Sequence, residues 1–270
     1  MKIYQYSADY SYSFPTVSLA YFLRYPNPYS KHVLSTDTIS QYIDPETQRL
    51  HTVRLHLKRS KVPAGILKFL PSGLSGPGGA STSYVLEKSI VDVKEGWMDT
   101  ESRNMEWTGI LSVVEQAVFQ DKSLSKIDGL TGTSCKTTVT FVSKLGQTLM
   151  KKRKMAQVQD DPAEHQADIE EDQPKQGFFA AWSTAGIQRT IELIGVKRSK
   201  TALVNSVEGM KIVLERMRNG GIKGVLEGMR HDRVEMLALH GLSDDGGSTW
   251  QQVWNRGAHR NDDDHDDHDD

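Results

Sequence analysis

The spacing of apolar residues changes once along this chain, and this change limits the folds that are open to it. Between Ile3 and Leu145, apolar and polar residues alternate with a period of two, which is typical of strands with one buried face. From Phe178 to Met217 the apolar residues recur every three or four positions, which is typical of one long amphipathic helix. The chain therefore divides into a strand-rich part and a later helical part.

Turn signals and one short helix separate the predicted strands. Pro15 suits the first position of a helix that continues through Val17–Tyr25, and a Pro-Asn-Pro sequence ends this helix. Asp44-Pro45-Glu46 supplies the turn of a half-buried antiparallel hairpin. The predicted strands are Ile3–Phe14, His32–Asp44, Leu50–Lys58, Ser83–Val93, Trp97–Trp107, Gly109–Gln120 and Thr137–Leu145.

The long helix carries one predicted contact stripe, and three segments outside the strands and this helix look different. The sequence Asn219-Gly220-Gly221 is predicted to end the helix, and with it a domain that spans residues 1–218. Residues 219–242 are predicted to form a weaker amphipathic helical extension to this domain. Residues 151–176, a charged insertion, and residues 243–270, an acidic and His-rich tail, are too polar to fold and are predicted to be disordered. The stripe consists of Trp182, Gly186, Arg189, Leu193, Val196, Lys200, Leu203, Val207, Met210, Leu214 and Met217.

Charge and cysteine content exclude some classes of protein. The 270 residues include 33 basic and 35 acidic side chains, and this balance gives no indication of nucleic-acid binding. Cys135 has no second cysteine to pair with, and we expect it to be a small buried strand residue. No segment reaches the roughly 20 apolar residues that span a bilayer, and the first ten residues carry no signal-peptide pattern.

Motifs of catalysis and metal binding are missing from the sequence. It contains no GxSxG, no phosphate-loop GxxxxGK[ST], no HExxH and no CxxC, so we predict neither an enzyme nor a metal or cofactor site. The glycine-rich segment Gly73–Ser81 is best explained as a linker. His265–Asp270 could bind a divalent cation weakly, but a solvated tail explains these residues better because nothing fixes their geometry.

Several cations occupy positions where a buried core would favour none. Arg24 lies at the end of the first helix among aromatic residues, Arg54 and Lys58 share one face of their strand with His56, and Lys200 falls within the helical stripe. An unpaired buried cation costs several kcal/mol. These side chains must therefore reach the solvent, pair with acidic residues, or bind an anion.

The segment RYPNPYS at Arg24–Ser30, continued by KHVLSTDTI, closely resembles the signature of the PRELI-like family. Further matching segments follow in the family's order: RLHLKRSKVP at Arg54–Pro63, SYVLEKSIVD at Ser83–Asp92, WTGILSVVE at Trp107–Glu115 and EGM at Glu208–Met210. The resemblance covers about residues 1 to 150 and 177 to 218.

This resemblance implies an α+β fold and a role in lipid transport. In the family, a curved antiparallel sheet of about seven strands wraps around a long C-terminal helix and encloses a lipid cavity with a short lid. The implied activity is transport of phosphatidic acid between the mitochondrial outer and inner membranes across the intermembrane space, in support of cardiolipin synthesis. The alternatives are a phosphatidylserine carrier and a lipid-binding adaptor or sensor that does not transfer. A small twin Cys-x9-Cys helical protein is the implied partner.

The resemblance also implies which side chains meet the lipid. Arg24, His32, Lys58 and Lys61 match family positions that line the cavity or its mouth, and Gly209-Met210 aligns Arg198 with a basic family position. A second basic position of the family falls at Asn205, where Lys200 could substitute. Cations suit a phosphomonoester, which arginine binds through two parallel hydrogen bonds. The implied lid, which would touch anionic membrane surfaces transiently, has the apolar residues Ile66, Leu67, Phe69 and Leu70.

Overall fold

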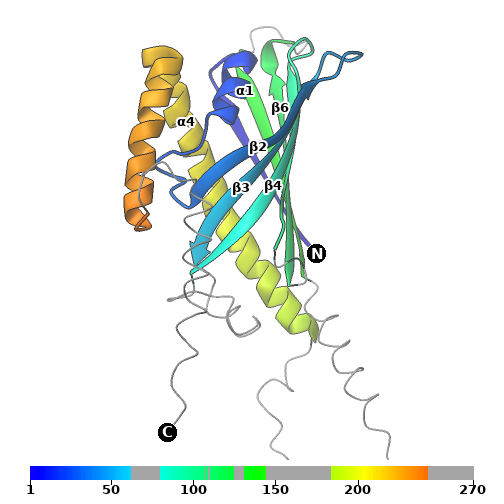
Figure 1. The fold of residues 1–270 in the computed structure, drawn as a ribbon. Coiled ribbons are helices and arrows are strands. Elements are labelled where there is room, and N and C mark those ends of the chain that lie inside the picture. The colour runs from blue at the N-terminus through cyan, green and yellow to red at the C-terminus, as the bar shows by residue number, and fades with distance from the viewer. Residues whose placement is uncertain (62–79, 107, 109, 125–130, 144–183, 243–270) are drawn as a thin grey trace, which may run out of the picture.

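In the part of the chain that the structure describes, there are seven strands and two α-helices (Figure 1). The computed structural model describes residues 1–61, 80–106, 108, 110–124, 131–143 and 184–242. The predicted lid, the insertion 151–176, the tail 243–270 and residues 73–79 of the predicted linker lie outside these residues, whereas Ala80 and Ser81, the end of that linker, begin a strand. The elements are β1 (Lys2–Tyr10), α1 (Phe14–Phe22), β2 (Val33–Ile43), β3 (Leu50–Lys61), β4 (Ala80–Asp92), β5 (Trp97–Asn104), β6 (Leu111–Asp121), the short 3₁₀ turn η2 (Lys122–Leu124), β7 (Thr133–Ser143) and α4 (Thr184–Leu239).

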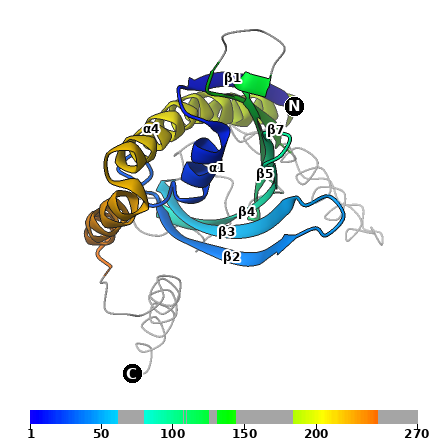
Figure 2. The ribbon, with the colours of Figure 1, turned by 90° about the horizontal axis from the view of Figure 1, so that it is seen from above.

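The strands form one antiparallel sheet in the order β1-β7-β6-β5-β4-β3-β2. The sheet curves strongly, and the first part of α4 crosses its open side while α1 lies inside the curve (Figure 2). This arrangement confirms the expected α+β fold with a curved antiparallel sheet and a long C-terminal helix.

Alternation of side chains explains which face of each strand is buried. In β1 the exposed and covered positions alternate along the strand, as its sequence pattern predicts. On β3 the side chains also alternate, but the apolar face is not the more buried one. Arg54 and His56 are buried, while Val53 and Leu55 are only half-buried. The charged face of this hairpin is therefore the one that turns into the interior.

The main core lies between α1, the sheet and the middle of α4. Pro15 stands in the first turn of α1, where a missing N–H costs nothing, so the helix begins at Phe14. Tyr21 packs edge-on against Phe119 of β6 at a ring-centroid distance of 5.4 Å. The fully buried members of this core include Phe14, Val17, Ala20, Met98, Val213, Leu214 and Val225.

A break at Gly221 divides α4 into two helical parts. Gly221 has φ 60° and ψ −156°, a conformation that only glycine adopts readily, so the helix changes direction there. The second part folds back beside the first (Figure 1) and packs Met236 and Leu237 onto Leu34 of β2 and Leu57 of β3. The sequence signal at Asn219-Gly220-Gly221 coincides with this break.

The predicted contact stripe is wrong in the first half of the long helix. Leu193 is 52% exposed and Lys200 is exposed, whereas Ile191 is buried. Gly195 explains the difference, because a Cβ atom there would lie 2.9 Å from the Phe141 ring of β7. The helix approaches the sheet through this glycine, which a pattern based on large apolar residues does not detect.

Several boundaries also differ from the predictions. The predicted strands Ile3–Phe14 and Trp97–Trp107 end earlier, at Tyr10 and Asn104, and the last strand begins at Thr133 instead of Thr137. Helix α4 is described from Thr184, and the first residues of its predicted range, 178–183, lie outside the described residues. Threonines and serines at the ends of β7 pair regularly with β6, so the backbone ladder continues beyond the apolar pattern.

Cys135 is buried within β7, as predicted, and burial raises the pKa of its thiol to about 11. Among the helices of the described residues, none has the length and apolar character needed to cross a membrane.

Candidate functional site

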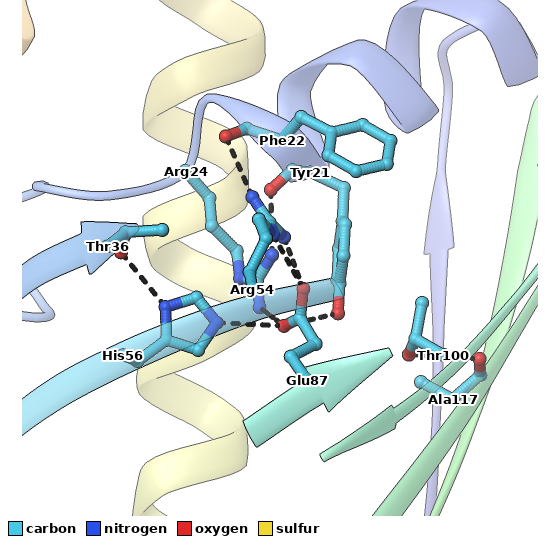
Figure 3. A network of polar contacts seen from close by, with 9 residues as sticks. All are labelled: Tyr21, Phe22, Arg24, Thr36, Arg54, His56, Glu87, Thr100 and Ala117. Carbon is cyan, nitrogen blue, oxygen red and sulfur yellow. Dashed lines mark hydrogen bonds and ion pairs between the residues drawn. The ribbon is translucent and has the colours of Figure 1, made fainter. Parts of the chain in front are cut away.

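Glu87 lies at the centre of a buried network of charges (Figure 3). Its carboxylate forms ion pairs with Arg24 and with Arg54, whose Nε donates to Glu87 Oε1 at 2.9 Å. The Tyr21 hydroxyl donates to Glu87 Oε2 at 2.9 Å, and His56 Nε2 lies 3.3 Å from the same oxygen. Two arginines therefore share one carboxylate inside the curve of the sheet.

Backbone carbonyl groups complete the coordination of the two guanidinium groups. Arg24 donates to the Tyr21 carbonyl oxygen at 2.7 Å, and Arg54 donates to the Phe22 carbonyl oxygen at 3.1 Å. The Arg24 guanidinium also lies 3.6 Å from the centroid of the Tyr21 ring. These carbonyls belong to the last turn of α1, where helices leave acceptors unpaired, so the cations favour this end of the helix.

The network shifts the pKa values of its titratable members. Burial alone would raise the pKa of Glu87, but Arg24, the His56 hydrogen bond and Arg54 hold this pKa well below its ordinary value. Burial lowers the pKa of His56 to about 4, and Arg24 and Lys58 act in the same direction, although contact with Glu87 opposes them. Near neutral pH, His56 is therefore neutral and Glu87 is ionised.

The RYPNPYS segment positions Arg24 through Asn27. Asn27 is buried, its amide donates to the Arg24 carbonyl oxygen at 2.6 Å, and its Oδ1 accepts from Tyr29 N at 2.9 Å. A Cβ atom at Gly209 of α4 would lie 2.8 Å from the Asn27 side chain. The two sequence motifs thus meet in space, because a glycine on α4 makes room for the asparagine that orders the loop.

Beside this network, a cavity of about 740 Å³ lies between the sheet and α4. Polar and charged residues outnumber apolar ones in its lining. Of its cationic groups, Lys58, Lys197 and Arg198 form no close ion pair with residues that the structure describes. The lining residues are Arg24, Tyr25, Tyr29, Ser30, His32, His56, Lys58, Glu87, Ser102, Glu115, Ile194, Lys197, Arg198, Thr201, Ala202, Leu203, Asn205 and Ser206.

The structure brings together four of the six predicted headgroup residues. Arg24, His32, Lys58 and Arg198 line the cavity, with Arg24 already paired to Glu87. Lys200 does not line it, and its Nζ lies 5.4 Å from the centroid of the Tyr4 ring. Lys61 is the last residue of β3, and its side chain lies outside the described part of the chain.

Sequence reasoning did not select Glu87, Glu115 or Lys197 as site residues. Glu87 could have been found from strand register, because it lies directly opposite Arg54 when β3 and β4 are paired. Lys197 precedes Arg198 on an exposed stretch of α4, where periodicity alone predicts only solvent contact. Within the described chain, no group of three metal-ligating side chains occurs.

The curved sheet and the long helix define an α+β protein, and between them lies a cavity lined by charged residues. Residues 15–159 match the model of the PRELI-like family, which is more than half of the chain, and the chain belongs to this family. Protein UPS1, mitochondrial, from Saccharomyces cerevisiae is 42% identical over 107 residues, which cover 40% of this chain and 57% of that protein.

Other relatives show the same extent of similarity. Protein ups1 homolog of Schizosaccharomyces pombe is 37% identical over 111 residues, covering 41% of this chain and 60% of that protein. Human PRELI domain-containing protein 1, mitochondrial, is 36% identical over 107 residues, covering 40% of this chain and 46% of that protein. The chain spans about half the length of the relatives it matches.

Proposed function

We propose that this protein is a mitochondrial carrier that binds phosphatidic acid and moves it between the outer and inner membranes across the intermembrane space, supplying cardiolipin synthesis. The names of the relatives place those proteins in mitochondria, and the family assignment supports lipid transfer rather than catalysis. The cation-lined cavity is the observation that carries the proposal, because a phosphomonoester bears between one and two negative charges near neutral pH.

Lys58 provides the sharpest test of this proposal. It lines the cavity and forms no close ion pair with any described residue, so its charge is available to a ligand. We expect Lys58→Glu to lower phosphatidic acid transfer between vesicles at least about tenfold, because a carboxylate would then face the phosphate. Lys88→Glu is the matched control, because Lys88 is exposed on the neighbouring strand β4.

The same substitution at Arg24 would give a less decisive result. Arg24→Glu would place two carboxylates together in the buried network and leave Glu87 with only Arg54, so loss of transfer could follow from loss of the fold. Circular dichroism must therefore accompany every variant. A folded Lys58→Glu protein that transfers phosphatidic acid at the wild-type rate would remove this cavity from the proposed function.

The same experiment distinguishes the alternatives. A phosphatidylserine carrier would move phosphatidylserine faster than phosphatidic acid, and an adaptor or sensor would bind vesicles without exchanging lipid between them. We further propose that the protein works with a small twin Cys-x9-Cys helical partner and touches anionic membrane surfaces only transiently. For the predicted lid, the test is transfer by the Leu67→Asp, Phe69→Asp double variant.

A further inference from the structure

Glu115 brings a carboxylate into the cavity without a close counter-ion. It lies on β6 and lines the same cavity as Arg24 and Lys58. Unlike Glu87, it forms no hydrogen bond or close ion pair with the residues that the structure describes. Glu115 is half-buried, and a carboxylate that is partly removed from bulk water normally has such partners, so its position beside the cations of this cavity needs an explanation.

Strand register places Glu115 at the end of a polar row. Arg54 lies opposite Glu87, Glu87 opposite Ser102, and Ser102 opposite Glu115. Directly opposed residues of antiparallel strands point to the same face, so these four side chains cross the inner surface of the sheet. The next residue in the row is Val139 of β7, so the row offers Glu115 no cation on that side.

The charges around Glu115 come from every part of the cavity wall. Burial raises the pKa of Glu115. The nearby charges of Lys58 and Arg24 lower this pKa and that of Glu87 raises it, so the net effect is an increase. A proton on Glu115 is therefore easier to hold than on an exposed carboxyl group. The titratable groups that share the cavity with Glu115 are Arg24, Tyr25, Tyr29, His32, His56 and Lys58, Glu87 of β4, and Lys197 and Arg198 of α4, while Cys135 of β7 interacts with Glu115 electrostatically.

We propose that Glu115 selects phosphomonoesters by sharing one proton with the bound phosphate, an inference that rests on the proposed function and adds the choice of headgroup to it. When Glu115 is ionised, its carboxylate accepts a hydrogen bond from the P–OH group of the monoanion. When Glu115 is protonated, it donates to an oxygen of the dianion. Both descriptions contain the same single proton between two oxygen atoms, and that proton comes from the solvent.

This arrangement rejects two other ligand forms. A phosphodiester, such as phosphatidylglycerol, has no P–OH group near neutral pH and would face the carboxylate with nothing to donate. A phosphate dianion beside an ionised Glu115 would meet like charge in a poorly solvated site. The cations of the cavity therefore attract any anion, and Glu115 distinguishes phosphomonoesters from the other anions.

A transfer assay with the full chain tests this selection. Donor vesicles of phosphatidylcholine carry a labelled phosphatidic acid, phosphatidylglycerol or phosphatidylserine, and exchange is followed from about pH 6 to about pH 8, across the range in which the phosphomonoester loses its second proton. In the wild type we expect phosphatidic acid transfer to fall as the pH rises. In Glu115→Gln we expect the preference for phosphatidic acid over phosphatidylglycerol to shrink at least about tenfold and the pH dependence to flatten.

Glu101→Gln is the matched control, because Glu101 is on β5 next to Ser102 and its side chain points to the opposite face of the sheet, where it pairs with Arg103. Calorimetry with glycerol 3-phosphate and with inorganic phosphate, in two buffers of different ionisation enthalpy, counts protons without any lipid. We expect uptake approaching one proton at about pH 8 in the wild type and in Glu101→Gln, and almost none in Glu115→Gln.

These measurements separate the failure of this inference from that of the proposed function. Equal preference, pH profile and proton uptake in wild type and Glu115→Gln would overturn the role of Glu115, while wild-type transfer of phosphatidic acid would still support the carrier. Absence of wild-type transfer, combined with proton uptake from glycerol 3-phosphate that Glu115→Gln abolishes, would overturn the carrier and retain the phosphomonoester selector. Wild-type preference for phosphatidylserine that Glu115→Gln abolishes would show that Glu115 binds an ammonium group, and would overturn proton sharing.

Discussion

At the scale of single residues, Glu87 controls how much positive charge the inside of the sheet can hold. Arg24 and Arg54 both pair with it, and each also donates to a carbonyl at the end of α1. Removing one partner from a buried pair typically costs about 3 to 5 kcal/mol, because the remaining charge has lost its compensation. The two arginines are therefore structural groups first, while Lys58, Lys197 and Arg198 line the cavity without a close ion pair to any described residue.

His56 gives the fold a specific sensitivity to acid. Its pKa falls from 6.5 to about 4 on folding, so between these values the unfolded chain binds a proton that the folded chain does not. Stability contributed by the neutral imidazole is complete above pH 6.5 and is lost as the pH falls towards about 4. The upper limit of this loss is about 3.5 kcal/mol, from about 1.4 kcal/mol per pKa unit.

We expect His56→Gln to remove this loss while retaining a donor to Glu87. The measurement is the free energy of unfolding by urea at several pH values, compared between wild type and variant. The low pKa of Glu87 adds a separate loss at lower pH, as this carboxylate becomes protonated, and that loss should remain in the variant. A variant with the same slope as the wild type between about pH 6.5 and about pH 4 would contradict the assignment.

The sequence predicted only part of the charged network around Glu87. Alternation correctly placed Arg54, His56 and Lys58 on one face of a strand, but it could not show that this face turns inward. The reason is that Glu87, which makes burial of the arginines possible, is 33 residues from Arg54 and is brought to it by strand pairing. Pairing with an acidic residue was one of the alternatives for these cations, and the register of β3 and β4 places Arg54 opposite Glu87.

At the scale of elements, two glycines determine how α4 meets the sheet. Gly195 touches Phe141, and Gly209 touches Asn27, so the helix approaches closely at two points where side chains are missing. The helical period correctly predicted one long helix and its later buried residues Leu203, Met210 and Leu214. It failed at the earlier turns, because a contact made through a glycine leaves no mark in a pattern of apolar residues.

We therefore expect Gly195→Ala to destabilise the protein, although alanine favours helices more than glycine does. The new methyl group would lie 2.9 Å from Phe141 Cδ1, and overpacking of this kind costs about 1 to 3 kcal/mol. Gly220→Ala is the control, because no atom lies within 4 Å of its Cβ position and alanine there should be neutral or slightly stabilising. Urea denaturation of the two variants gives the comparison, and equal stability would show that α4 tolerates displacement.

The last turns of α4 have an anchor of their own. Met236 and Leu237 pack on Leu34 and Leu57, a different apolar cluster from the main core, whereas Val225, nearer the break at Gly221, belongs to the main core. Arg216 pairs with Asp232 at 2.5 Å across the bend. Detachment of the turns after Asp232 should therefore leave the sheet, α1 and Val225 in place.

The double variant Met236→Asp, Leu237→Asp tests this independence. We expect faster amide hydrogen exchange in residues 233–242 and in the nearby start of β2, because buried carboxylates cannot be accommodated between the helix and Leu34. Exchange in β6, β7 and around Val225, which packs in the main core, should remain slow. Loss of protection throughout the sheet would show that the last turns of α4 belong to the same cooperative unit as the core.

At the scale of the whole molecule, the resemblance to the PRELI-like family predicted the architecture well, and the periodicity predicted its parts. The seven strands, their antiparallel order and the long helix agree with the expectation. The curvature of the sheet and the charged character of the cavity could not be derived from periodicity, because both depend on contacts between distant segments.

The proposed partner gives a prediction for the complete protein. The fold has no disulfide, and a protein that binds only the folded state stabilises it by mass action. We expect low solubility when the chain is expressed alone and a soluble complex when a twin Cys-x9-Cys protein is co-expressed, as judged by size-exclusion chromatography. Recovery of a monodisperse, fully active chain without any partner would contradict this expectation.

The order of the strands has a mechanical consequence for the cavity. Because β1 and β2 are the two ends of the sheet and do not pair with each other, the ring around the interior is completed by α4 (Figure 2). Separating two neighbouring strands would break a row of backbone hydrogen bonds, whereas sliding α4 along β1 and β7 would exchange side-chain contacts alone. The cavity is thus bounded by one stiff wall and one compliant wall, and any increase in its width has to come from the compliant side.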